Sequence, residues 1–141
     1  MEFRKAELRD LGDVAKLITI EFAEEIGKNL PYLKEDGNPN KFLSIWNKCI
    51  EMNTHSIYVC YDEDKLLGAI GGYITTQTYS DNPIYGVEDF WYVKEKYRNK
   101  NIGVKLYNMF EEWLKKLNVD KVQMMHYPYA PKLKDFYENK T

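Results

Sequence analysis

The 141-residue sequence has little of what marks several classes of protein. It holds only two cysteines, Cys49 and Cys60, whose spacing fits neither a metal site nor a disulfide scaffold, so we expect reduced, buried thiols and no metal. No apolar run approaches about 18 residues, and no signal peptide opens the chain. Membrane insertion and secretion are therefore not expected, and a cytoplasmic protein follows by default.

An excess of charge of one sign is also lacking. Lys and Arg number 20 against 22 Asp and Glu, and this balance argues against nucleic-acid binding across the whole surface. Internal repeats and linker-like segments are absent as well, so we expect one domain over residues 1–141. A chain of this size buries roughly 68–70% of its unfolded surface, which is enough for a core.

The stretch from Val87 to Leu117 has the clearest pattern. Val87–Val93 is rich in β-branched and aromatic residues and lacks Gly and Pro, which favours a buried strand. A basic loop, Lys94–Asn101, comes next. Apolar residues then recur at gaps of three and four and predict one helix face: Ile102, Leu106, Met109, Phe110, Trp113, Leu114 and Leu117. Unpaired N–H groups and the macrodipole at the start of this helix make the junction a place for a phosphate.

Weaker patterns predict the other elements. Gly68, Gly71 and Gly72 interrupt a strand and predict a β-bulge or a close approach of another backbone. In chain order we expect a strand (1–6, with Phe3 inward), a helix from the N-cap Asp10 to Gly27, a loop (28–40), a helix (40–52), an antiparallel hairpin (56–61 and 66–78), the central strand and helix with Asn118 as a left-handed cap, a strand (119–126) and a short helix (132–139).

Residues 98–104, Arg-Asn-Lys-Asn-Ile-Gly-Val, resemble the Arg/Gln-x-x-Gly-x-Gly/Ala signature of the GNAT family of N-acetyltransferases. Asn101 replaces the first glycine, and Asn is the residue that best tolerates the left-handed conformation after Gly. The predicted order of elements is also similar to that of the family. The resemblance implies an α/β (α+β) fold with a mixed, mostly antiparallel sheet flanked by helices. The family usually continues with a further C-terminal strand or hairpin, which is missing here; either a partner subunit, as in a homodimer, covers that edge, or the chain is a pared-down variant.

The resemblance implies direct transfer of an acetyl group from acetyl-coenzyme A to a primary amine on a small molecule or a protein. Loop amides, helped by Arg98 and Lys100, would hold the pyrophosphate. The pantetheine arm would lie along the central strand and pair with its backbone. The coenzyme-binding residues implied are Trp91, Tyr92, Val93, Arg98, Asn99, Lys100, Asn101, Ile102, Gly103 and Val104. A solvated basic loop on a surface helix is the alternative interpretation.

In many relatives a carboxylate on the central strand accepts the proton of the amine. Glu88 and Asp89 are the candidates here, and strand alternation predicts that they face opposite sides. We prefer Glu88 because this alternation puts it on the face of Phe90 and Tyr92, and nearby aromatic rings raise a carboxyl pKa by desolvation. A structural or substrate-orienting role for Glu88 is the alternative.

A second catalytic residue is implied near the end of the chain. Lys134–Glu138 resembles the Phe-Tyr-Glu segment of the family's last helix, in which the tyrosine often donates a proton to the departing thiolate. The resemblance gives this role to Tyr137, with a packing role as the alternative. His55 and His126 are weaker candidates, because a lone histidine is more often structural.

The acceptor and the activity itself stay open in the sequence. Five acidic residues hint at a cationic acceptor, although a solvated acidic face explains them equally well: Glu21, Glu24, Glu25, Glu35 and Asp36. Polyamines, aminoglycosides and protein lysines all stay open as acceptors of the acetyl group. A non-catalytic coenzyme-binding or protein-interaction domain of the same fold is the second hypothesis, and a nucleic-acid binder is the least favoured.

Overall fold

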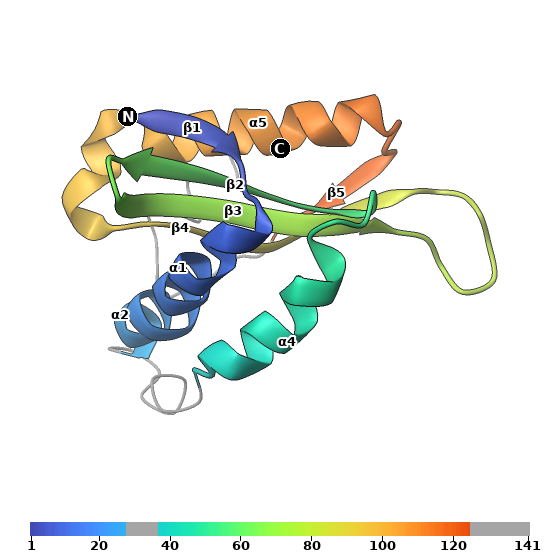
Figure 1. Cartoon of the computed structure of the whole chain (residues 1–141). Coiled ribbons are helices and arrows are strands. Elements are labelled where there is room, and N and C mark those ends of the chain that lie inside the picture. Colours follow the sequence, from blue (N-terminus) through green and yellow to red (C-terminus); the bar gives the residue numbers. More distant parts are fainter. Residues whose placement is uncertain (28–36, 125–141) are drawn as a thin grey trace.

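Five strands form one sheet in the order β1-β2-β3-β4-β5 (Figure 1). The computed structural model of the chain describes residues 1–27 and 37–124. The first four strands pair antiparallel and β5 pairs parallel to β4, which confirms the predicted mixed, mostly antiparallel sheet. The strands are β1 (Glu2–Lys5), β2 (His55–Asp62), β3 (Lys65–Thr75), β4 (Tyr85–Val93) and β5 (Lys121–Gln123).

Helices cover both faces of the sheet (Figure 1). One face, which we call the α4 face, carries α1 (Leu11–Lys16), the π-helical segment η2 (Leu17–Phe22), α2 (Ala23–Gly27) and α4 (Pro39–Cys49). The other, the α5 face, carries α5 (Ile102–Lys116). Among the described residues, no helix is long and apolar enough to cross a membrane.

Each face has its own apolar core. In β4, Phe90 and Tyr92 join the core of the α4 face, while Trp91 and Val93 join the core of the α5 face. Burial of one such large side chain contributes about 1.5–3 kcal/mol, so these two cores hold the helices to the sheet. The helical residues buried in them include Leu11, Val14, Trp46, Ile102, Leu106, Phe110 and Leu114.

The helices predicted within the described residues are present, the predicted helix 132–139 lies outside them, and three local features differ from the prediction. The first helical run contains the π-helical turn η2, a feature often found at functional sites. The basic segment that was expected to be a loop forms a 3₁₀ helix, η3 (Glu95–Lys100). The side chain of Asp10 does not cap α1. Asn118 does adopt the predicted left-handed conformation, with φ 56°. Of the two thiols expected to be buried, Cys60 is buried and Cys49 is partly exposed.

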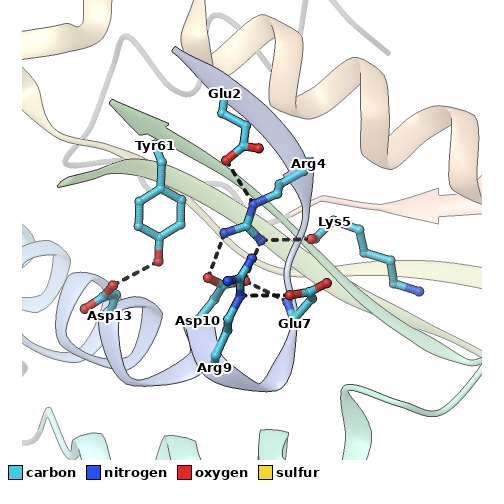
Figure 2. A network of polar contacts seen from close by, with 8 residues as sticks. All are labelled: Glu2, Arg4, Lys5, Glu7, Arg9, Asp10, Asp13 and Tyr61. Carbon is cyan, nitrogen blue, oxygen red and sulfur yellow. Dashed lines mark hydrogen bonds and ion pairs between the residues drawn. The ribbon is translucent and has the colours of Figure 1, made fainter. Parts of the chain in front are cut away.

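The Asp10 carboxylate instead ties β1 to the first helix (Figure 2). It accepts hydrogen bonds from Arg4 Nη1 (2.6 Å) and Nη2 (2.9 Å) and from the backbone N–H of Glu7 (2.8 Å). The hydrogen bonds from Arg4 hold the pKa of Asp10 below its usual value, although burial opposes this. Beside this pair, the Tyr61 hydroxyl donates to Asp13 (2.9 Å), so β2 is joined to the same helix.

Candidate functional site

The strand that carries the site contains a β-bulge. The register of β3 and β4 shifts so that Gly71 lies opposite Phe90 and Gly72 lies opposite Glu88, which leaves Asp89 as the extra residue. The two glycines make this close pairing possible. A Cβ on Gly71 would lie 2.5 Å from the Phe90 ring, and one on Gly72 would collide with the carbonyl of Val87. The bulge predicted from the glycines is confirmed.

The bulge changes the direction in which the two carboxylates point. Gly72 faces α5, because a Cβ there would meet the ring of Phe110, and its partner Glu88 shares that face. Glu88 is completely buried there. The prediction that Glu88 shares a face with Phe90 and Tyr92 is therefore wrong. The prediction assumed that side chains alternate without interruption from Glu88 to Tyr92. The extra residue Asp89 interrupts this alternation, so Phe90 and the residues after it face the opposite side from the one expected.

Beyond the bulge, no described strand lies along one edge of β4, which we call the open edge in this sense. β5 pairs with β4 only from Tyr85 to Val87, whereas β4 continues to Val93. Within the part of the chain that the structure describes, no strand pairs with Glu88–Val93 along this edge. Backbone N–H and C=O groups along the edge of a strand can pair with an added strand or with another amide-bearing chain.

The open edge leads to the start of α5. Asn101 precedes the helix with φ 61° and ψ 19°, so it adopts the left-handed conformation expected of the residue that replaces a glycine. The first hydrogen bond of the helix runs from Lys105 N–H to the Asn101 carbonyl (3.1 Å). The N–H groups of Ile102, Gly103 and Val104 therefore have no acceptor within the helix.

Gly103 is not required by the packing of the protein itself. A Cβ there would lie 3.6 Å from Val93 and 3.7 Å from the Trp91 indole, which are ordinary contacts. The structure thus brings four of the predicted coenzyme residues together: Trp91, Val93, Ile102 and Gly103.

Arg98 braces this junction against α2. Its Nε donates to the carbonyl of Val93 (2.9 Å), and its Nη2 donates to both carboxylate oxygens of Glu25 (2.8 Å each). The guanidinium also lies 5.3 Å from the centre of the Tyr92 ring. Burial, assisted by the charge of Glu25, raises the pKa of Tyr92 to about 12. The sequence predicted a contact of Arg98 with pyrophosphate and did not predict this ion pair.

Lysine side chains surround Tyr97 on the outer side of η3. The ammonium groups of Lys65, Lys96 and Lys100 lie 5.5–5.9 Å from the centre of its ring. Lys65 also donates a hydrogen bond to the Tyr97 hydroxyl (3.1 Å), and this bond lowers the pKa of the phenol. The cationic character predicted for the segment is therefore concentrated around one ring.

A second group of polar and aromatic residues lies on the α4 face, beside the bulge. Trp46 of α4 lies beside Asp89 of β4, and its ring meets the rings of His55 and Phe90 edge-on, with centroids 5.5 Å and 6.0 Å apart. His55 also stacks on Tyr73 (5.5 Å), and its Nδ1 is 2.8 Å from the Thr54 hydroxyl. The sequence analysis did not predict this group. It did predict a bulge, and a bulge at Asp89 places this side chain on the same face as Phe90.

Both ionisable members of this group are shifted toward their neutral forms. Partial desolvation raises the pKa of Asp89, although the nearby Trp46 indole and the charge of His55 oppose the shift. Burial lowers the pKa of His55, and the charge of Asp89 opposes that shift. Both residues still reach solvent, since Asp89 is exposed and His55 is half-buried. Such paired shifts beside a surface are typical of functional sites.

The family model of the acetyltransferase (GNAT) family matches residues 19–139. The chain belongs to the GNAT family. The recognition made from residues 98–104 is thereby confirmed. Tyr137 and His126 lie outside the described residues, as do Glu35 and Asp36, so the structure does not place them.

Solved structures share this GNAT fold at low sequence identity. A mutant of the BH1408 protein from Bacillus halodurans has a TM-score of 0.80 at 20% identity, with 99% of this chain and 91% of that chain covered. A second neighbour is an aminoglycoside acetyltransferase, meta-AAC0020, from an uncultured soil metagenomic sample, in complex with sisomicin. Its TM-score is 0.72 at 17% identity, with 99% of this chain and 86% of that chain covered. Glucosamine-6-phosphate N-acetyltransferase from Arabidopsis thaliana has a TM-score of 0.69 at 20% identity, with 98% of this chain and 88% of that chain covered. No curated protein matches the sequence.

Proposed function

We propose that this protein is an N-acetyltransferase that moves an acetyl group from acetyl-coenzyme A directly to a primary amine. The observation that carries the proposal is the continuity of two features: the open edge of β4 ends at the N–H groups that begin α5. An amide-bearing arm on that edge would bring an attached pyrophosphate to the start of the helix. Membership of the GNAT family supports the same assignment.

The residues present fit a pyrophosphate-bearing coenzyme. Helix-start amides favour an anion, and the left-handed Asn101 turns the backbone into the helix without a side-chain cap over those amides. Gly103 leaves space that the protein does not itself use. We assign the arm to Trp91, Tyr92 and Val93 and the diphosphate to residues 99–104. Acetyl-coenzyme A, when bound, supplies the activated thioester.

Arg98 takes a different role in this proposal from the one suggested by the signature. Its guanidinium is already held by Glu25 and by the Val93 carbonyl, so it acts first as a brace that fixes the end of β4. Its positive charge still favours a diphosphate nearby. We therefore place Arg98 among the coenzyme-binding residues through its charge and its positioning of Val93.

The acceptor is proposed to be a primary amine, and the two neighbours that are an aminoglycoside acetyltransferase and a glucosamine-6-phosphate N-acetyltransferase support this choice. Glu88 as the base and Tyr137 as the acid remain predictions. The burial of Glu88 on the α5 face means that an amine on the α4 face would be nearer to Asp89. A choice between these carboxylates needs variants of each.

Two measurements on the full chain test the proposal. Calorimetry with acetyl-coenzyme A should show saturable binding, and thiol release in the presence of a panel of primary amines should exceed the amine-free rate. Binding without amine-dependent thiol release would favour the alternative, a non-catalytic coenzyme-binding domain. Absence of binding at several temperatures would remove both.

A further inference from the structure

The group on the α4 face has the composition of a receptor for an organic cation. It joins one exposed carboxylate, Asp89, to the rings of Trp46, His55 and Tyr73. Aromatic faces attract ammonium groups, and a partly desolvated carboxylate pairs with them more strongly than one in bulk water. The four residues come from α4, β2, β3 and β4, so the fold assembles the group from distant parts of the chain.

The geometry also holds the histidine ring in a defined orientation. The Thr54 hydroxyl is 2.8 Å from Nδ1, and the ring is fixed between Tyr73 on one side and the edge contact with Trp46 on another. In the tautomer whose Nδ1–H donates to the Thr54 hydroxyl, Nε2 carries no hydrogen and can accept a proton. Trp46 contacts both His55 and Asp89, so one buried residue positions both ionisable side chains.

We propose that Asp89 and His55 receive the acceptor amine of the acetyl transfer, with Asp89 pairing with the ammonium group and the neutral imidazole of His55 taking one of its protons. This inference rests on the proposed function and names the acceptor subsite of that same reaction. Trp46 and Thr54 are positioning residues. Glu88, on the opposite face of the sheet, is not needed for this step.

The step balances in the following way. The amine enters as R–NH₃⁺, gives one proton to His55 Nε2, and the resulting imidazolium is stabilised by the negative charge of Asp89. The nitrogen lone pair attacks the thioester carbonyl, a C–N bond forms and the C–S bond breaks. The departing thiolate takes the second proton lost by the nitrogen, and His55 returns the first to solvent. The products are the N-acetyl amine and the free coenzyme thiol.

This arrangement selects a class of acceptor. Asp89 would repel a carboxylate carried next to the amine, whereas a simple ammonium group would meet a carboxylate and aromatic rings. We expect tyramine to be preferred over tyrosine, which differs from it by a carboxylate on the carbon that carries the amine. Their ratio of kcat/KM should be at least about tenfold, the factor that corresponds to about 1.4 kcal/mol.

The test compares Asp89→Asn and His55→Gln with the wild-type chain. Asp89→Asn should raise the amine KM about tenfold or more, and His55→Gln should lower kcat by about 100-fold, a typical contribution of a general base. Both should keep wild-type affinity for acetyl-coenzyme A. Asp81→Asn, an exposed carboxylate in the connection between β3 and β4, is the matched control and should leave all three quantities unchanged.

The pH profile distinguishes this role from a structural one. Neutral His55 is the active form, so kcat/KM should fall as the pH drops through its pKa, which burial keeps below the usual 6.5. Asp89 is the charged group that acts on His55, and it raises that pKa. Asp89→Asn should therefore move the acid limb of the profile to lower pH, and His55→Gln should abolish it.

The outcomes are separable from those of the proposed function. If the wild type acetylates amines but both variants keep its amine KM, kcat and acid limb, the acceptor subsite is overturned while the acyltransferase assignment stands. Preference for tyrosine over tyramine would overturn the selectivity. If the wild type binds no acetyl-coenzyme A and acetylates no amine, the proposed function fails, and this inference fails with it.

Discussion

The Arg98 guanidinium donates to both carboxylate oxygens of Glu25 at 2.8 Å, and this ion pair joins α2 to the segment between β4 and α5. The two residues are 73 positions apart in the sequence. Because the same guanidinium also holds the Val93 carbonyl, the helix on the α4 face is connected directly to the proposed coenzyme site.

Glu25→Gln should separate the structural role of this pair from its electrostatic one. Both side chains are partly exposed, so we expect a loss of only about 0.5 kcal/mol in the free energy of unfolding. Removing a negative charge beside an anionic coenzyme should at the same time lower its Kd a few-fold. Calorimetry at low and high salt measures the second effect, which salt should weaken. Glu112→Gln, exposed on α5, serves as the control, and an unchanged Kd in Glu25→Gln would contradict the electrostatic role.

Asp10→Asn should destabilise the fold in a pH-dependent manner. The side chain is 5% exposed and is paired with Arg4, so its loss should cost about 3 kcal/mol at neutral pH. The pKa of Asp10 is depressed in the folded state, so its contribution is present above the unfolded pKa near 3.9 and is lost as the pH falls through the folded value. Urea unfolding should therefore show the wild type approaching the variant in stability as the pH falls below about 4. A constant difference down to pH 2 would contradict this account.

Gly72→Ala and Gly103→Ala form a matched pair. The first puts a methyl group into the Val87 carbonyl and should cost about 2 kcal/mol or more, while the second meets only ordinary contacts and should unfold like the wild type. If the space at Gly103 serves the coenzyme, Gly103→Ala should still weaken its binding. Thermal unfolding and calorimetry measure the two effects, and equal stability losses in both variants would refute the bulge argument.

Asn101 should tolerate glycine and reject valine. Its φ of 61° costs little for Asn or Gly but about 1–2 kcal/mol for a residue with a branched Cβ. Asn101→Gly should keep coenzyme affinity, and Asn101→Val should lose stability and affinity together. A valine variant that binds like the wild type would show that the left-handed turn is not needed for binding.

Glu88→Gln tests the base predicted from the sequence. If Glu88 takes the proton of the amine, the variant should lose turnover at neutral pH and lose less at high pH, because more of the amine is then already deprotonated. If the proton goes to His55 beside Asp89, the variant should keep the wild-type pH profile. Steady-state rates between pH 6 and about 9.5 decide between these outcomes, since this range approaches the ordinary pKa of a primary amine.

Local patterns carried most of the fold prediction. Gaps of three and four from Ile102 onward determined α5, and three glycines of β3 indicated the bulge where β3 pairs with β4. The left-handed conformation predicted for Asn101 was confirmed, because this conformational preference is a property of the Asn residue itself. The family signature also lies in one continuous segment. Interactions within a few residues were enough for each of these.

The sequence by itself determined the order of the elements, the strand–loop–helix junction and the family, because each depends on neighbours along the chain. Only the tertiary structure decided which carboxylate faces which helix, since one extra residue in β4 reverses the alternation and the partner strand sets where it falls. It alone joined Trp46, His55 and Asp89, and likewise Glu25 and Arg98. Contacts between residues far apart in sequence form only when the sheet and its two helical layers pack, so no local pattern contains them.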